Sequence, residues 1–589
     1  MTTRKLGAAV LALALTAAGI VLAATADAGT APSGPAAALQ PRTAPTDQND
    51  IRRWQHGRTV APASPARAAA TGETAALMVS VLDRSGAAPG PDHAGYALAF
   101  DLASGALTVV ELTDGVGTVE VPAGSYLVQA FVETVEPGGA VSLSMPMQSR
   151  VSVAGKTATT LDARTTAPVD VAVDRADARL AGGTVQITQT TPEQTIWYAA
   201  DFDYAGGLYV QPTGQVPGLA LDVFGQLSAG GARTSPYLYA VQFRSAGEIP
   251  RRPSYAARTR SLAALTVSFA GQDRPGCARF GVSGYDPDLA VGLGGSVTLG
   301  AVPGEYPVYV TPTSDTVWRL SGEVLGPDCA ETPGGDGFAL AGQLFRTAGT
   351  YRVPFGRAPL GPGVASPAAL PGAPTAADRD GDVLWIQIPV YADAGAHRGG
   401  RTAASFEEYP YTTGRTTLSV DGGETIGTSD RTGYGAFQVA PEAARYRLTT
   451  ESTRDDAPWS NLSTGQRTTW TFTSEANAAT APLPLLAVRY DMALDDLNRA
   501  PSGGPFTFRA FAERNGSASG PRITSLSVTA SFDDGATWQP VALQHRAGQW
   551  LATLDQPAGD GYVSLRAEAR DADGNTVDQT TLRAYALRS

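Results

Sequence analysis

The sequence predicts an all-β protein built from tandem β-sandwich domains, transthyretin-like or immunoglobulin-like, behind a signal peptide and a disordered linker. Runs of five to eight residues rich in Val, Leu, Thr and Tyr alternate with Gly, Pro, Asp and Asn turns. No window holds a convincing helix of 15 or more residues. Short strands at regular spacing are typical of sandwiches. Because 589 residues exceed what one hydrophobic core accommodates, several domains are expected.

The N-terminus has the features of an export signal. Arg4 and Lys5 give a positive start, and residues 6–24 carry no charge. Ala26-Asp27-Ala28 then fits a small-x-small cleavage site ahead of Gly29. Because the uncharged run is long enough to span a bilayer, an uncleaved anchor is the alternative. No later segment reaches 18 apolar residues, so no membrane span is expected in the mature chain.

Composition changes along the chain predict the domain order. Residues 29–74 are dominated by Ala, Pro, Thr and Arg without apolar periodicity, which is typical of disorder. Residues 361–377 are rich in Pro, Ala and Gly and are expected to form a second linker. The predicted order is signal peptide 1–28, disordered linker 29–74, transthyretin-like sandwich 75–166, irregular β domain 167–260, β domain with a disulfide 261–360, linker 361–377, β-sandwich 378–482 and C-terminal immunoglobulin-like sandwich 483–589.

Charge and cysteine content narrow the function classes. The chain has 44 basic and 56 acidic residues, a formal charge of −12, which argues against nucleic acid as a partner. Cys277 and Cys329 are an even pair in a chain with an export signal, so a disulfide and a secreted, extracellular location are expected. Two free buried thiols are the alternative. Without a nearby histidine the pair does not make a zinc site.

A Pro-containing turn recurs before three predicted strands. Val121-Pro122-Ala123-Gly124-Ser125-Tyr126 has the pattern Pro-x-Gly-x-Tyr, and Val302-Pro303-Gly304-Glu305-Tyr306 is a version one residue shorter, Pro-Gly-x-Tyr. A looser copy, without the glycine, ends at Tyr446. Each turn delivers a tyrosine into an extended segment whose alternate residues face a core. The pattern resembles a turn of transthyretin-like and carboxypeptidase-regulatory-like sandwiches.

No known catalytic constellation is found, so the chain is predicted not to be an enzyme. A serine hydrolase needs a nucleophile, a base and an orienting acid. The four candidate bases, His56, His93, His397 and His545, all lie in predicted loops or hairpins. The sequence holds no His-Glu-x-x-His helix and no phosphate-binding Gly-x-x-x-x-Gly-Lys-Ser/Thr loop. No catalytic residue, metal ligand or cofactor is therefore assigned.

Residues 531–538 match an Asp-box, Ser-x-Asp-x-Gly-x-Thr-Trp. Sialidases carry several such boxes, but the box itself is a β-hairpin turn. Ser531, Asp533, Gly535 and Trp538 are therefore predicted to shape a turn and to pack beneath it.

Two acidic clusters are candidate calcium sites. Asp378, Asp380 and Asp382 form one, and Asp571, Asp573 and Asn575 form the other. Calcium takes six to eight oxygens, whereas each cluster offers three side chains and lacks the glutamate that completes an EF-hand. The alternative for both is a hairpin or linker turn.

Several strand-and-turn strings follow one another in a specific order. They include Asp378-Arg379-Asp380-Gly381-Asp382, Thr469-Trp470-Thr471-Phe472-Thr473-Ser474 and residues 161–164, 235–240, 391–393, 446–450, 483–485, 563–567, 573–576 and 583–587. Over about residues 76–589 this order resembles the long C-terminal accessory region of secreted subtilisin-like serine peptidases from high-GC bacteria. Those peptidases carry a catalytic domain where this chain has the predicted linker. The resemblance thus implies export and accessory β domains, and no catalytic residue carries over.

These observations favour a secreted, non-catalytic binding or scaffolding protein whose partner is an extracellular protein or cell-wall carbohydrate. A regulator that docks onto a secreted subtilisin-like peptidase is one alternative, and a hydrolase with an unrecognised carboxylate pair is another. Trp197, Trp385 and Trp459 are candidates for a carbohydrate groove, with burial in a sandwich core as the other interpretation.

Overall fold

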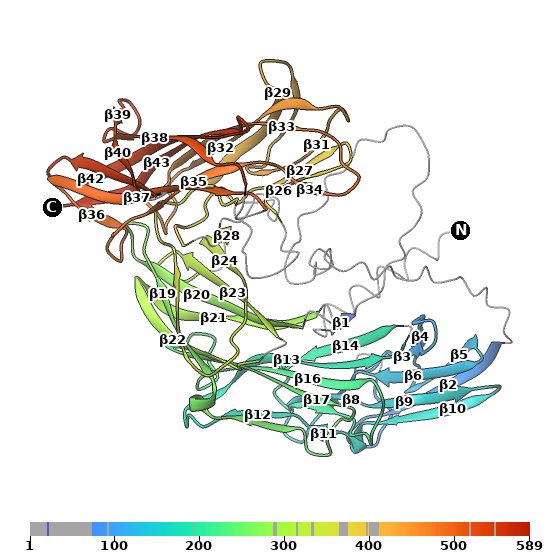
Figure 1. The fold of residues 1–589 in the computed structure, drawn as a ribbon. Helices are drawn as coiled ribbons and strands as arrows, with labels where there is room; N and C mark the ends of the chain where they lie inside the picture. The colour runs from blue at the N-terminus through green and yellow to red at the C-terminus, as the bar shows by residue number, and fades with distance from the viewer. Residues whose placement is uncertain are drawn as a thin grey trace.

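The computed structural model describes residues 20–22, 74–90, 93–192, 194–286, 291–313, 316–330, 335–364, 375–395, 398–399, 411–516, 520–546 and 549–589. Regular structure within these ranges is almost entirely β, which confirms the predicted fold class (Figure 1). The cleavage site at Ala28 and Gly29, the rest of the predicted signal peptide apart from residues 20–22, and the linker up to residue 73 lie outside the described residues. Within the described ranges, no helix is long and apolar enough to cross a membrane.

An N-terminal body, residues 74–261, begins with two facing sheets. The first has the strand order β10 (Thr157–Asp162), β2 (Thr74–Leu82) and β5 (Val116–Pro122), and the second β4 (Leu107–Glu111), β3 (Tyr96–Asp101), β6 (Gly124–Ala130) and β9 (Met147–Val153). A four-stranded sheet follows, with the order β11 (Ala167–Pro168), β15 (Leu208–Val210), β8 (Val141–Met145) and β7 (Val132–Val135). A two-stranded sheet pairs β12 (Asp170–Val173) with β18 (Ser254–Ala257). This part also contains the 3-10 turns η3 (Ala163–Thr165) and η4 (Thr259–Ser261).

The sheet that contains β3 and β6 is buried on both faces. Ala97, Ala99 and Val128 belong to the core shared with β2. Leu98 and its neighbours on the opposite face belong to a second core, which includes side chains of the next sheet. Three sheets are therefore stacked, and the predicted boundary at residue 166 runs through the contact between two of them.

An eight-stranded sheet leads from the N-terminal body into a middle body, residues 263–364. Its order is β1 (Ile20–Leu22), β14 (Thr195–Asp201), β13 (Ala178–Thr190), β16 (Leu219–Ala229), β17 (Leu238–Ala246), β22 (Gly304–Val310), β19 (Ala263–Phe269) and β25 (Thr350–Phe355). Parallel pairing of β17 with β22 carries the sheet across the predicted boundary at residue 260. The predicted domains 167–260 and 261–360 therefore share one sheet.

The middle body is closed by a second sheet, with the order β21 (Val291–Val302), β20 (Gly276–Asp286), β23 (Val317–Leu325), β24 (Gly335–Gln343) and β28 (Arg398–Gly399). Its core includes Phe224 of β16, whose ring centroid lies 6.5 Å from that of Trp318. Cys277 of β20 forms a disulfide with Cys329, as predicted, and closes a loop with a sequence separation of 52 residues.

The C-terminal body, residues 375–589, contains three sheets. The first has the order β31 (Tyr434–Gln438), β27 (Val383–Gln387), β26 (Ala377–Asp380) and β34 (Ala481–Pro482). The second has the order β30 (Thr425–Ser429), β29 (Thr412–Val420), β32 (Ala444–Arg454), β33 (Gly465–Ser474), β43 (Thr576–Arg588), β42 (Gly561–Asp571), β38 (Ile523–Ser531) and β39 (Gln539–Pro540), and β36 (Arg499–Pro501) pairs parallel to β43. The third has the order β35 (Leu486–Asp491), β37 (Gly504–Arg514), β41 (Gln549–Gln556) and β40 (Ala542–Arg546).

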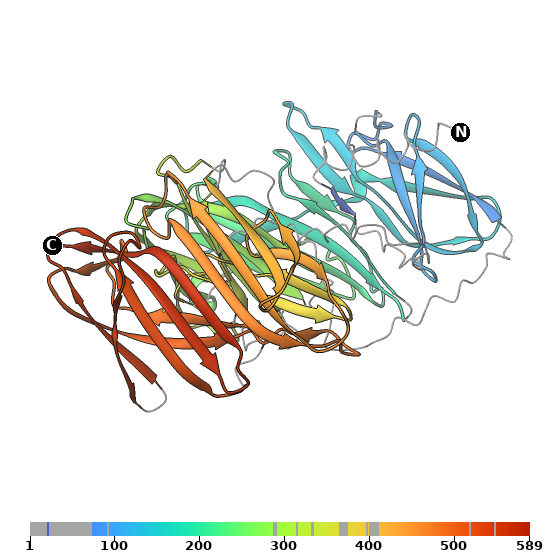
Figure 2. The same ribbon diagram turned by 90° about the horizontal axis from the view of Figure 1, so that it is seen from above.

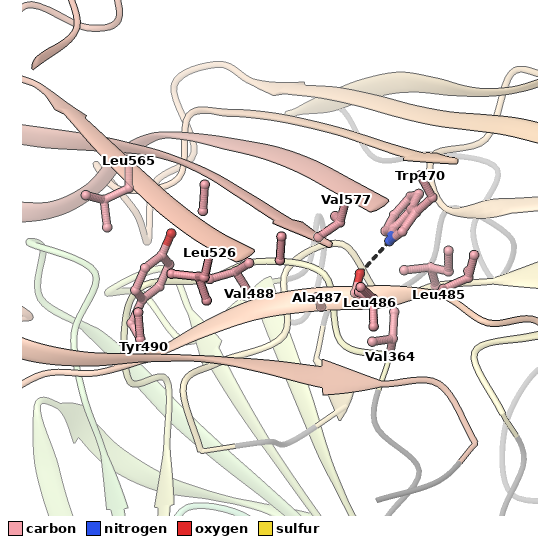
Figure 3. Packing of buried hydrophobic residues seen from close by; sticks show 14 of the residues in the cluster. Val364, Trp470, Leu485, Leu486, Ala487, Val488, Tyr490, Leu526, Leu565 and Val577 are labelled. Atoms are coloured by element: carbon pink, nitrogen blue, oxygen red, sulfur yellow. Dashed lines mark hydrogen bonds between the residues drawn. The ribbon is translucent and has the colours of Figure 1, made fainter. Parts of the chain in front are cut away.

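One continuous core fills this body. Figure 3 shows Trp470 of β33 packed beside Leu485 and Leu486, with its indole Nε1 donating to the Leu486 carbonyl at 2.6 Å. Antiparallel pairing of β33 with β43 joins strands from both sides of the predicted boundary at residue 482. The nine-stranded sheet therefore unites the two predicted C-terminal sandwiches.

The predicted linker 361–377 is not solvated along its whole length. Val364 is fully buried in the C-terminal core, and Gly361 pairs with Ala392. Residues 375–377 lead directly into the buried strand β26. The composition predicted a flexible spacer because Ala, Pro and Gly are common in linkers, yet small residues also pass through tightly packed junctions. Residues 365–374 lie outside the described residues.

Buried polar contacts join the middle body to the C-terminal body. The guanidinium of Arg454 donates to both carboxylate oxygens of Asp336 at 3.0 and 2.7 Å. Asn498 donates through Nδ2 to the carbonyls of Gly271 and Gly356 at 2.9 and 2.8 Å. Both contacts are shielded from solvent and satisfied by hydrogen bonds, so they fix the two bodies in one orientation.

The three bodies are arranged in a C. In Figure 1 the C-terminal body lies at the top and the N-terminal body at the bottom, and the middle body joins them at the left. Figure 2 shows strands of the C-terminal body lying over the middle body. Because sheets and cores continue from each body into the next, the chain is not a string of independently packed sandwiches.

Candidate functional site

None of the predicted loop histidines that the structure describes is hydrogen-bonded to a nucleophile. Nδ1 of His93 lies 3.3 Å from the carboxylate of Glu133, which also accepts from Tyr204 at 3.1 Å. Within the described residues, no hydroxyl or thiol is hydrogen-bonded to the His93 ring. His545 is stacked on Trp550 at 4.4 Å between ring centroids. His56 and His397 lie outside the described residues.

Two carboxyl groups in the described ranges have a raised pKa. Burial raises the pKa of Asp201 on β14, although Thr184 donates to it at 2.7 Å. Burial also raises the pKa of Glu513 on β37, against the opposing influence of Arg489. The two groups lie in the N-terminal and C-terminal bodies, so they do not form a glycosidase-like pair.

The Asp-box residues form a closed hairpin turn. Asp533 accepts from the backbone N and Oγ1 of Thr537 at 2.8 and 2.6 Å and from Oγ of Ser531 at 2.7 Å. These bonds lower the pKa of Asp533 to about 2. Gly535 has a φ of +89°. A Cβ at Gly535 would lie 3.4 Å from the Trp538 ring, so the tryptophan packs beneath the turn. The hydrogen bonds of the turn occupy the Asp533 carboxylate.

Asp571 also has its carboxylate occupied by donors. It is buried and accepts from the backbone N and Nδ2 of Asn575 at 2.9 and 3.1 Å and from Arg514 at 3.0 Å. Burial acts to raise the pKa of Asp571, but the bonds from Asn575 and Arg514 outweigh it and the pKa is lowered. A guanidinium in this position takes the place that a cation would need, which favours the turn interpretation for residues 571–575.

The other acidic cluster lies on the β26–β27 hairpin. Asp378 accepts a short hydrogen bond from Thr375, and Asp380 is exposed opposite Val383. Asp382 contributes its backbone carbonyl to Val439 at 2.8 Å. No group of three His, Cys, Asp or Glu side chains in the described part of the chain is positioned to hold a metal ion.

The candidate tryptophans do not share a groove. Trp459 is 1 % exposed and meets Tyr411 edge to face at 5.5 Å. Trp197 is half-buried against the middle core, and Trp385 is half-buried on β27. The core interpretation therefore holds for Trp459, and the three side chains lie on different elements.

An extended polar face covers the nine-stranded sheet instead. We call it the Thr face and define it by the outward residues of β30, β29, β32 and β33. Cross-strand register aligns Thr428, Thr417, Thr449 and Thr469 in one row. Oγ1 atoms of Thr417 and Thr428 lie 3.3 Å apart, and those of Thr449 and Thr469 lie 3.2 Å apart. Alternation places these hydroxyls outward because the intervening residues fill the core below.

Charges on the Thr face are paired within the face. Glu451 accepts from Arg415 at 2.7 Å and is also bonded to Arg467. Asp421 accepts from Arg447 at 2.8 Å and Arg445 at 3.1 Å. The bonds from Arg447 and Arg445 lower the pKa of Asp421. The face is thus hydroxyl-rich, and its four arginines and two carboxylates leave a formal charge of +2 with every one of these charges in an ion pair. Its sequence signal is the alternate placing of Thr, Arg and Glu along three strands that are adjacent in the sheet.

Comparisons with known proteins give no family. No family model matches the sequence, and no curated protein matches it. Among solved structures, the chain is similar to the Bacillus anthracis TIE protein, with 10 % identity, a TM-score of 0.12, and 48 % of this chain and 50 % of that chain covered. It is also similar to Escherichia coli alpha-2-macroglobulin activated by porcine elastase, with 11 % identity, a TM-score of 0.13, and coverage of 88 % and 53 %.

A third similar structure is a Streptococcal ancillary pilin, with 12 % identity, a TM-score of 0.11, and coverage of 48 % of this chain and 99 % of that chain. The chain spans about half the length of the TIE protein and of the macroglobulin. The superpositions are poor in all three cases, so they establish neither a shared function nor a shared partner.

Proposed function

We propose that this chain is a secreted, non-enzymatic scaffolding protein that binds neutral cell-wall carbohydrate through the Thr face. The observation that carries the proposal is the row of threonine hydroxyls across four adjacent strands, held on a rigid sheet. Each hydroxyl is one donor and two acceptors, the same inventory that a sugar hydroxyl has. Strands about 4.8 Å apart repeat this group at a spacing that suits a polymer of repeating units.

Paired charges support a neutral ligand. Glu451 and Asp421 are each bonded to two arginines, so every one of these charges already has a partner on the face although a formal charge of +2 remains. A sugar that replaces water here exchanges hydrogen bonds without removing an unpaired charge from solvent, which keeps the desolvation cost low.

Secretion is supported by the predicted export signal and by the disulfide. The Cys277–Cys329 bond persists in oxidising compartments and is rare in the cytosol. A regulator that docks onto a secreted subtilisin-like peptidase is the alternative function, and the test below distinguishes the two.

The test is co-sedimentation of the purified mature chain with washed cell walls. We compare Thr449→Val/Thr469→Val with the matched control Thr507→Val/Thr553→Val. The control pair is a cross-strand threonine pair on the four-stranded sheet, with Oγ1 atoms 3.4 Å apart. Valine keeps the shape and the strand preference but removes the hydroxyl.

We expect the first variant to lose wall binding and the control to keep it. Equal binding by both variants would contradict a role for the Thr face. Recovery of a peptidase from culture supernatant, with no wall binding, would replace this proposal by the regulator hypothesis.

A further inference from the structure

An arginine-rich surface lies far from the Thr face, on the side of the molecule that carries β12 and β18. In Figure 1 this region is at the lower left, beside the label of β12. Residues 249–272 contain four arginines and no acidic residue, in a chain whose formal charge is −12. Those arginines, Arg251, Arg252, Arg258 and Arg260, flank β18 and are all exposed.

Two further exposed arginines extend the same surface. Strands β19 and β25 are parallel, with Ala264 paired to Thr350. The segments that enter them therefore leave the sheet at one end, which brings Arg346 to the end where Arg260 lies. Arg352 follows on β25. Residues 337–377 also contain no Asp or Glu. We call these six side chains the Arg strip.

The nearby carboxylates offset only part of this charge. Asp170 and Asp174 lie on and just after β12, which pairs with β18. Asp174 accepts from the backbone N and Oγ1 of Thr259 at 2.9 and 2.5 Å, and these bonds lower its pKa. Glu248, three residues before Arg251, is a third nearby carboxylate and accepts from Gln215 at 2.9 Å. Six arginines against these three carboxylates leave a formal charge of +3.

The Arg strip differs from the other arginine-rich surface of the protein. On the Thr face each arginine has a carboxylate partner within the sheet. Among the residues that the structure describes, no ion pair of 4 Å or less joins an arginine of the Arg strip to a carboxylate, and Arg258 acts on Asp174 only through its charge at longer range. A cluster of like charges without such pairs repels itself, and an anionic ligand would relieve that repulsion.

We propose that the Arg strip binds a linear, phosphate-bearing polymer of the cell surface. Guanidinium groups donate two parallel hydrogen bonds to a phosphate, and their charge is constant over the physiological pH range. Arg252 and Arg258 are separated by an extended segment, so about 20 Å of ligand is needed to engage both, at roughly 3.3 Å per residue. That span is too long for a single small anion and fits a polymer that repeats its charge.

The site is independent of the Thr face, and the two support one role. The Thr face offers neutral hydroxyl chemistry on the C-terminal body, whereas the Arg strip offers cationic chemistry at the junction of the other two bodies. A rigid molecule that carries both surfaces would hold two kinds of envelope polymer at a fixed separation. This inference rests on the scaffolding role proposed above.

The test is a fluorescence-anisotropy titration of labelled inorganic polyphosphate with the purified mature chain. The variant is Arg251→Gln/Arg252→Gln/Arg258→Gln/Arg260→Gln. Its control, Arg150→Gln/Lys156→Gln/Arg546→Gln/Arg570→Gln, removes the same charge from exposed positions elsewhere. Because all eight side chains are exposed, we expect both variants to keep the melting temperature of the parent.

We expect binding at about 50 mM salt to weaken steeply toward about 200 mM, with about 0.7 counterions released per phosphate contact. The Arg-strip variant should lose affinity about tenfold or more and show a shallower salt slope, while the control stays within about threefold. Equal losses in both variants would overturn the proposal, because net charge alone would explain them. Absence of binding at low salt would also overturn it.

Two competitor arms identify the ligand chemistry. Polygalacturonate tests carboxylates, and single-stranded DNA tests a nucleic-acid backbone. Competition by either one as strong as that by unlabelled polyphosphate would overturn the phosphate-polymer assignment. Wall sedimentation of the same variants separates this proposal from the previous one: an Arg-strip variant that loses polyphosphate but keeps carbohydrate binding leaves the Thr face proposal standing.

Discussion

Three arginine side chains lie almost entirely inside the C-terminal body and its junction with the middle body. Arg379, Arg454 and Arg489 are 1 %, 3 % and 2 % exposed. Arg489 donates to the carbonyls of Gly361, Pro362 and Ala392 at 3.3, 3.1 and 3.4 Å. A guanidinium has five donors in a fixed plane, so it can satisfy several carbonyls where strands and connections meet. Buried arginine therefore organises the junction, although arginine is usually a surface residue.

Replacing Arg454 should destabilise the protein strongly. Arg454→Met leaves the carboxylate of Asp336 buried without its partner, which costs about 3–5 kcal/mol. Denaturant unfolding followed by tryptophan fluorescence measures the loss. The control is the double variant Arg454→Met/Asp336→Leu, which removes both charges and should recover most of the stability. A single variant as stable as the double variant would contradict this account.

The Asp533 turn should respond to acid. Hydrogen bonds from Thr537 and Ser531 lower the pKa of Asp533 to about 2, below its value in an unfolded chain. A lowered pKa stabilises the folded state above the unfolded pKa, near 4, and that contribution is lost as the pH falls toward 2. NMR titration of the carboxyl carbon should give a midpoint near 2. Thr537→Val should raise that midpoint, whereas Thr553→Val should leave it unchanged.

At the scale of elements, β16 and β35 are buried on both faces, as the central strands β3 and β6 are. Every residue of β16 except the last is buried, and β35 is buried from Leu486 to Tyr490. Such strands connect two cores and cannot be removed without opening both. The sheet that contains Trp318 covers one side of β16, where Trp318 packs against Phe224. The disulfide joins Cys277 of β20 in that sheet to Cys329 in the turn after β23.

Removal of the disulfide should lower the stability of the middle body. The bond closes a loop with a sequence separation of 52 residues, which corresponds to about 4 kcal/mol in the chain-entropy model. We expect Cys277→Ala/Cys329→Ala to lower the midpoint of the calorimetric transition of the middle body. A reducing agent should lower the midpoint of the parent protein by the same amount and leave that of the variant unchanged. An unchanged midpoint in both would show that the loop is already constrained without the bond.

Strand positions and turn shapes can be predicted from local sequence, whereas the pairing of strands from different predicted domains cannot. β2 begins at Thr74, one residue before the predicted start of the first sandwich, and the tyrosines of two of the recurring Pro-containing turns bond back to the backbone. Tyr126 donates to the Pro122 carbonyl at 2.7 Å, and Tyr306 donates to the Ala301 carbonyl at 2.5 Å. Period-two alternation predicts which residues face a core, but it carries no information about which distant strand lies alongside.

The Thr face was missed for the same reason. Thr417, Thr449 and Thr469 are separated by 20 or more residues in sequence, and only the register of β29, β32 and β33 aligns them. Threonine alternating with apolar residues indicates a half-buried strand, and nothing in one strand shows that its neighbours repeat the pattern. The Asp-box turn, in contrast, depends on eight consecutive residues, so its shape was predictable.

At the scale of the whole molecule, the predicted domains merge into three bodies with linked cores. The core that contains Phe224 of β16 also contains Val390 and Trp459. The C-terminal core extends from Val364 to Leu587. Cooperative units are therefore expected to be larger than single sandwiches.

Truncation should reveal these units. A fragment of residues 378–482 ends before the strand β43 that pairs with β33, so it exposes a long sheet edge and half of a core. We expect it to be insoluble or unfolded by circular dichroism, whereas residues 74–589, which keep all the linked cores, should give the spectrum of a folded β protein. A well-folded 378–482 fragment would show that the shared sheet is dispensable.

The pairing of β17 with β22 has a consequence for how such a gene changes over time. Modules that fold alone can be duplicated, lost or exchanged at their borders, because each carries its own core. Here the segments on either side of residue 260 complete one sheet, so a recombination event at that point would leave two incomplete halves. We expect related proteins to keep the segment from β13 to β25 together as one unit. We also expect substitutions on β17 to be accompanied by compensating substitutions on β22.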